Sequence, residues 1–137
     1  MGHYRIKPED LDRCYTVKIA NRYYGRLVAE VQRLLRELNF NVSSIGFNYW
    51  VLAIIDFRRN YYKFNNTMEN VYDYLALQFN TTRTRVERAM RTARLKADAD
   101  IKEHFNYNNK LTNKTVLVLL SQQFYILQND NHIPHID

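Results

Sequence analysis

The sequence is short of the residues that cross-link a chain or break its helices. Of its 137 residues, three are glycine, two are proline and one, Cys14, is cysteine. A single cysteine excludes an intramolecular disulfide, and so few glycines and prolines argue against a protein built of hairpins. We therefore expect Cys14 to be a small packing residue and the chain to be helical.

Long apolar runs are missing as well. No stretch approaches the roughly 20 apolar residues that cross a bilayer. The N-terminus contains Arg5, Lys7, Glu9 and Asp10 and lacks the apolar centre of a secretory signal. We therefore expect no membrane contact and a cytoplasmic location.

Motifs of catalysis and metal binding are absent too. No glycine-rich phosphate loop, nucleophile with an adjacent base or paired-carboxylate motif stands out, so we expect neither an enzyme nor a cofactor. His132 and His135 have a spacing seen in metal sites, but no cysteine and no convergent acids accompany them. We assign them to a polar tail and predict no metal.

The sequence is rich in apolar and aromatic residues. Hydrophobic residues make up 46% of the chain, with 11 tyrosines and 7 phenylalanines, which is enough to bury a core without disulfides or a metal. The apolar residues recur every three or four positions, as on helix faces. This spacing predicts core helices over residues 27–38, 45–57, 68–79 and 82–97 and from residue 112 or 113 to 127.

Helix ends are marked by capping residues. Residues 39–41 suit a helix stop, because asparagine tolerates left-handed backbone angles, and Thr67 suits an N-cap. Either Thr81 or Thr82 can cap the helix that follows, or Thr84 with Glu87 can form a capping box. For the last helix the cap is Thr112 or Asn113.

Residues 70–97 have the pattern of a helix-turn-helix. A short helix ending at Phe79, a break over residues 80–82 and a second helix give the spacing that places a second helix in the DNA major groove. Asn80 suits the turn. The apolar seam between the two helices is predicted to consist of Leu75, Phe79, Val86 and Ala89.

Positive charge is concentrated in the second of these helices. The chain has 20 Lys and Arg against 14 Asp and Glu, a net charge of +6, and residues 81–97 contain six cations against the single acid Glu87. A helix that is only solvated usually interleaves acids with its cations. An anionic partner, double-stranded DNA, is therefore the favoured interpretation. The six cations are Arg83, Arg85, Arg88, Arg91, Arg94 and Lys96.

The two sides of this helix differ in character. At 100° per residue, one side gathers Val86, Ala89, Met90, Ala93 and Ala97 and is predicted to pack; the other gathers Thr84, Glu87, Arg88, Arg91 and Leu95. Arg88 and Arg91 can each contact guanine with two hydrogen bonds, and Glu87 can accept from cytosine. The predicted contacts to DNA phosphates, near the helix N-terminus, are Thr82, Arg83, Thr84 and Arg85.

The same residues resemble a known family. The run TTRTRVERAMR at residues 81–91 is similar to the recognition helix of the C-terminal effector domain of the stage-zero sporulation master regulator. LTN at 111–113 and SIGFNYW at 44–50 extend the similarity, which spans residues 28–124. The resemblance implies an all-α, compact bundle of about six helices that reads bases through Glu87, Arg88 and Arg91. It also implies a homodimer or tandem pair on DNA, here without the family's phospho-receiver domain.

We therefore expect an N-terminal extension over residues 1–25, a helix-turn-helix DNA-binding domain over 26–127 and a flexible polar tail over 128–137. The predicted function is sequence-specific binding of double-stranded DNA, as a transcriptional regulator or as an accessory protein of a plasmid or phage. The alternative is an interaction protein that pairs with a related DNA-binding regulator and inhibits it. Exposed Leu95 and the N-terminal tyrosines Tyr15, Tyr23 and Tyr24 would then offer the partner surface.

Overall fold

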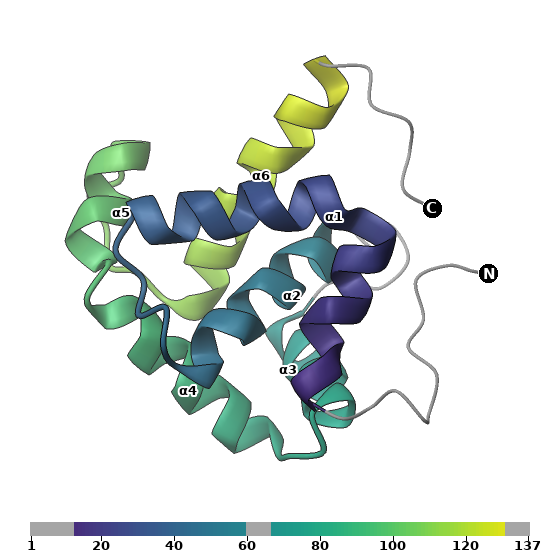
Figure 1. Cartoon of the computed structure of the whole chain (residues 1–137). Helices are drawn as coiled ribbons and strands as arrows, with labels where there is room; N and C mark the ends of the chain where they lie inside the picture. The colour runs from purple at the N-terminus through teal and green to yellow at the C-terminus, as the bar shows by residue number, and fades with distance from the viewer. Residues whose placement is uncertain (1–12, 60–66, 131–137) are drawn as a thin grey trace.

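The computed structural model describes residues 13–59 and 67–130, which form helices joined by short loops and contain no strand (Figure 1). This confirms the predicted all-α bundle of about six helices. None of the described helices is long and apolar enough to span a membrane. The helices are α1 (Arg13–Glu37), α2 (Ile45–Arg59), α3 (Met68–Gln78), α4 (Arg83–Leu95), α5 (Asp98–Phe105) and α6 (Asn113–Asp130).

Several helix bounds differ from those that periodicity predicts. Helix α1 begins at Arg13, inside the segment expected to be an N-terminal extension, and α6 continues to Asp130. Helix α5 forms over an acidic stretch that periodicity left unassigned. Its first turn carries Asp98 and Asp100, and carboxylates at that end are stabilised by the helix dipole.

Asparagines and threonines mark the helix ends. Asn39, Asn80 and Asn106 have φ angles of 70°, 53° and 51° and follow α1, α3 and α5, so the left-handed stops predicted at the first two are confirmed. Thr67, Thr82 and Thr112 each accept a backbone N–H three residues on at 3.2 Å. Thr82 is therefore the cap of α4, and the alternative that starts the helix with Thr84 is wrong.

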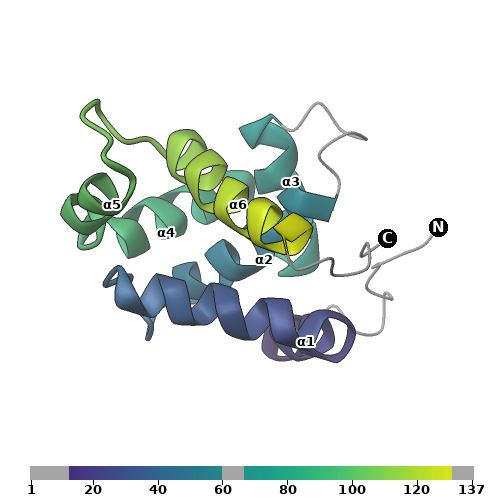
Figure 2. The same ribbon diagram turned by 90° about the horizontal axis from the view of Figure 1, so that it is seen from above.

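Helix α2 is the centre of the bundle. It lies between α1 and α6 when the bundle is seen from above, and it packs against both of them (Figure 2). Every side chain from Trp50 to Ile55 is fully buried, as in a helix that is apolar on most of its sides and is surrounded by other helices. Because α2 also packs on α3 and α4, it carries the helix-turn-helix on one of its faces.

Helices α2 and α4 approach each other closely at Gly46. A Cβ atom at this position would lie 2.2 Å from the carbonyl oxygen of Ala89 and 2.8 Å from the Cβ of Ala93. Both distances are shorter than van der Waals contact, and the first is to backbone, which cannot rotate away. Only glycine therefore fits at this crossing.

Replacing Gly46 tests this approach. We expect Gly46→Ala to lower the free energy of unfolding by about 2 to 4 kcal/mol, because α2 and α4 must move apart to admit the methyl group. Gly25→Ala is the matched control: Gly25 lies within α1 with nothing within 4 Å of a Cβ, so this change should raise stability by about 0.5 to 1 kcal/mol. Urea unfolding measures both, and similar values for the two variants would contradict the close approach.

Candidate nucleic-acid interface

Helix α3, its turn and α4 form the predicted helix-turn-helix. The turn is closed by a hydrogen bond from Thr81 N to Ala76 O at 2.9 Å, with Asn80 left-handed between them. Phe79 is buried at the turn and meets the ring of Tyr49 edge to face at 4.8 Å between centroids. This aromatic contact fixes the turn against α2.

The two sides of α4 are separated as its periodicity predicts. Val86, Met90 and Ala93 are fully buried, whereas Arg88 and Arg91 are exposed and Glu87 is half-buried. The three predicted base readers therefore share the face that α4 turns away from the core. Thr82, Arg83, Thr84 and Arg85, the predicted phosphate contacts, are all exposed around the N-terminal turn.

Two of the exposed arginines are paired with acids. Arg91 donates to Glu87, one turn earlier in α4, at 2.5 Å. Arg83 binds both carboxylate oxygens of Asp73 on α3 at 2.9 Å, and this hydrogen-bonded pairing raises the pKa of Arg83. Within the described part of the chain, no acid pairs with Arg85 or Arg88.

The count of cations on α4 needs a correction. Sequence reasoning counted Arg94 among the six cations that face only Glu87, as part of the charge available to an anionic partner, but its side chain is buried, with 5% of the residue exposed. Two acids outside the helix, Asp73 and Asp98, also pair with its arginines. Charge counting along the sequence misses both effects because the partners come from neighbouring elements.

Arg94 is the centre of a buried polar network. Its Nη1 lies 2.8 Å from both carboxylate oxygens of Asp98, and its Nε donates to Asn113 Oδ1 at 2.8 Å. A longer bond of 3.4 Å reaches the carbonyl oxygen of Leu111. The guanidinium thereby ties the end of α4 to α5 and to the start of α6, so its role is structural.

Asn113 extends this network to the middle of α4. Its Nδ2 donates to Tyr72 Oη at 3.0 Å and to the backbone carbonyl of Glu87 at 3.2 Å. Burial is the main cause that raises the pKa of Tyr72. Sequence reasoning considered Asn113 as a helix cap and as part of the family resemblance. In the structure its side chain bridges α3, α4 and α6.

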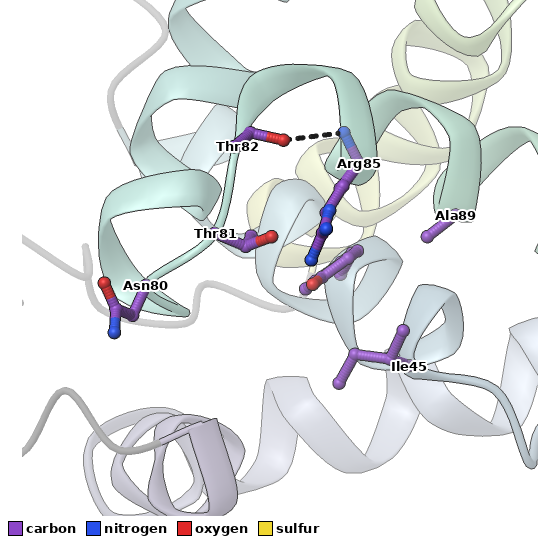
Figure 3. Close-up of a pocket in the computed structure, with 7 residues that line it drawn as sticks. Ile45, Asn80, Thr81, Thr82, Arg85 and Ala89 are labelled. Carbon is purple, nitrogen blue, oxygen red and sulfur yellow. Dashed lines mark hydrogen bonds between the residues drawn. The ribbon is translucent and has the colours of Figure 1, made fainter.

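A hollow lies beside the start of α4. It has a volume of about 550 Å³ and is bordered by the turn, the first turns of α4 and the N-terminal part of α2. Figure 3 shows the Arg85 side chain running from α4 toward Ile45 on α2, with Thr81 on one side. An unpaired guanidinium and two threonine hydroxyls at a helix N-terminus suit an anion such as a DNA phosphate. The lining residues are Ile45, Tyr49, Asn80, Thr81, Thr82, Arg85 and Ala89.

The described residues contain no group of three or more metal-ligating side chains. His132 and His135, the sequence's weak metal candidates, lie outside the described residues.

One comparison with known proteins gives a match. Residues 31–124 match the model of the family described as sporulation initiation factor Spo0A C terminal. This range includes the last two turns of α1, all of α2 through α5 and most of α6, and therefore the whole helix-turn-helix. Neither the curated proteins nor the solved structures give a match to the chain.

The different roles of the arginines on α4 can be tested by stability. Arg94→Met keeps a long apolar chain but leaves Asp98 and Asn113 without their partner, so we expect a loss of about 3 kcal/mol in the free energy of unfolding. Arg88→Met is the matched control and should stay within about 0.5 kcal/mol, because Arg88 is exposed. Equal losses in urea unfolding would contradict the structural role of Arg94.

Proposed function

The chain belongs to the family of the C-terminal domain of the sporulation initiation factor Spo0A, and we propose that it recognises specific double-stranded DNA sequences through α4. The family is one of DNA-binding domains. In a helix-turn-helix the second helix enters the major groove, and here that helix is α4. The proposed role is that of a transcriptional regulator.

The observation that carries this proposal is the common exposed face of Glu87, Arg88 and Arg91 on the second helix of the motif. Arg88 and Arg91 each offer the forked donors that match guanine O6 and N7, and Glu87 offers an acceptor for cytosine N4. We propose that these three side chains read bases. Their register along the groove would be set by contacts to the phosphates.

The proposed phosphate contacts lie at the start of the same helix. Arg85 suits this task best, because it borders the hollow and has no acidic partner in the described structure. Arg83 is shared with Asp73, so its charge is partly neutralised before DNA arrives. Thr82 and Thr84 add hydroxyls beside the backbone amides of the helix N-terminus.

Pairing on DNA, as a homodimer or on tandem sites, is part of the proposal. A helix-turn-helix reads only a few base pairs, and a second copy on an adjacent half-site lengthens the site that is recognised. The ratio of protein to duplex at saturation, measured with a duplex that carries the selected site, would give the number of copies bound.

Replacing the proposed base readers tests the assignment of α4. A preferred site is first selected from a random pool of duplexes, and binding is then compared on this site and on a scrambled duplex at one fixed salt concentration. Arg88→Ala and Arg91→Ala should each cost about 1 to 3 kcal/mol on the selected site and relax the preference at one base position. The loss on the scrambled duplex should be much smaller.

Stability serves as the control, since both arginines are exposed and their replacement should change unfolding by no more than about 0.5 kcal/mol. Unchanged discrimination in both variants would overturn the recognition-helix assignment. A folded wild type that binds no duplex would favour an interaction protein that pairs with a related regulator.

Salt dependence tests the phosphate contacts. Each phosphate neutralised by the protein adds about 0.9 to the slope of log affinity against log salt on duplex DNA. Arg85→Ala should flatten this slope by about 1 on any sequence, and Arg83→Ala should flatten it less because Asp73 already neutralises Arg83. Arg26→Ala, an exposed arginine on α1, is the control and should leave the slope unchanged. Equal slopes for wild type and Arg85→Ala would contradict the proposed contact.

A further inference from the structure

Helix α4 is held by its backbone as well as by its side chains. Three of its carbonyl oxygens, those of Glu87, Met90 and Ala93, accept hydrogen bonds from outside the helix. Asn113 on α6 donates to the first at 3.2 Å, the indole N–H of Trp50 on α2 to the second at 2.8 Å, and the backbone N–H of Asn41 to the third at 3.1 Å.

These three carbonyls follow one another at intervals of three residues. They therefore lie along one side of the helix and span about 9 Å of its length, at 1.5 Å per residue. The donors belong to α6, α2 and the loop between α1 and α2. Three fixed points from three separate elements determine both the rotation of α4 about its axis and its position along that axis.

Apolar packing alone would hold α4 less strictly. Burial of Val86 and Met90 fixes which side of the helix faces the core, but apolar contact has no preferred direction. Hydrogen bonds require donor and acceptor to be aligned within a limited angle. The carbonyl bonds therefore remove the small rotations and shifts that packing still allows.

This restriction matters for a helix that reads bases. Arg88 and Arg91 form two hydrogen bonds to a guanine only when the guanidinium lies in the plane of the base edge. Phosphate contacts tolerate small rotations of the helix because they depend mainly on charge. A change in the orientation of α4 would therefore reduce sequence discrimination more than overall affinity.

We propose that Trp50 and Asn113 are positioning residues for DNA reading, and that their bonds to the carbonyls of Met90 and Glu87 fix the orientation in which α4 presents its arginines. The proposal rests on the proposed function, since it assumes that α4 reads bases. Both side chains are buried away from the reading face, with 0% and 5% of each residue exposed. Their influence on DNA must therefore pass through the position of α4.

Two substitutions remove the donors and keep part of each side chain. Asn113→Asp replaces the donating amide by a carboxylate and keeps the acceptor that faces Arg94. Asn109→Asp is its matched control, because it adds the same negative charge at an exposed position of the preceding loop. Trp50→Phe keeps an aromatic ring beside Phe40, which Trp50 meets edge to face, and loses only the N–H and part of the ring.

The measured quantity is discrimination, the ratio of the dissociation constants for the scrambled and the selected duplex at one salt concentration. A variant that is only partly folded binds both duplexes more weakly by the same factor, so this factor cancels in the ratio. Loss of stability alone therefore leaves discrimination unchanged, whereas misplacement of α4 lowers it. The circular dichroism of each variant reports its folded fraction separately.

We expect Asn113→Asp and Trp50→Phe each to lower discrimination by roughly threefold to tenfold, which corresponds to the net contribution of one hydrogen bond. Asn109→Asp should weaken binding to both duplexes equally and leave their ratio unchanged. If the wild type discriminates and both donor variants keep its ratio within about twofold, the positioning role is wrong while the proposed function stands. A wild type that binds both duplexes equally would overturn the proposed function itself.

Discussion

Helices α2 and α4 lie close together at Gly46, where no side chain separates their backbones. This close approach constrains the rest of the domain. Trp50 follows Gly46 by one helical turn and therefore lies on the same side of α2. Because Gly46 lets the two backbones come together, the indole of Trp50 reaches the carbonyl of Met90. Because α4 covers this side of α2, the other three helices, α1, α3 and α6, pack on its remaining sides.

The arginines of α4 have different roles according to what surrounds them. The Arg94 side chain is buried and donates hydrogen bonds to fixed acceptors. Removing its guanidinium would leave the carboxylate of Asp98 and the Oδ1 of Asn113 without their donor. Because Arg94 is buried, its pair with the partly buried Asp98 is costly to break. Arg83 and Arg91 form exposed pairs, which contribute little to stability because water screens them. A single helix thus carries one arginine that holds the fold and others that are available to a ligand.

Local features of the fold could be predicted from the sequence, because they depend on residues close together in the chain. The spacing of apolar residues predicted each described helix except α5, and the order of polar and apolar positions predicted the two sides of α4. Asn80 predicted the turn, and Thr82 was one of the residues expected to cap the helix. Burial of Arg94 could not be predicted, since it depends on Asp98 in α5 and Asn113 in α6. The bond from Trp50 to Met90 joins residues 40 positions apart, and no local pattern reports it. The base-reading roles of Arg88 and Arg91 stay predictions.

The pair between Glu87 and Arg91 bears on how such a surface would engage DNA. An exposed pair of this spacing is worth about 0.3 to 0.5 kcal/mol, whereas a two-bond contact from arginine to guanine contributes about 1 to 3 kcal/mol of discrimination. Exchanging the first for the second is therefore favourable where guanine is present. Where guanine is absent, Arg91 gains nothing by leaving Glu87, and the negative charge of Glu87 facing the duplex opposes binding. The pair would thus weaken binding to incorrect sequences while costing little on the correct one.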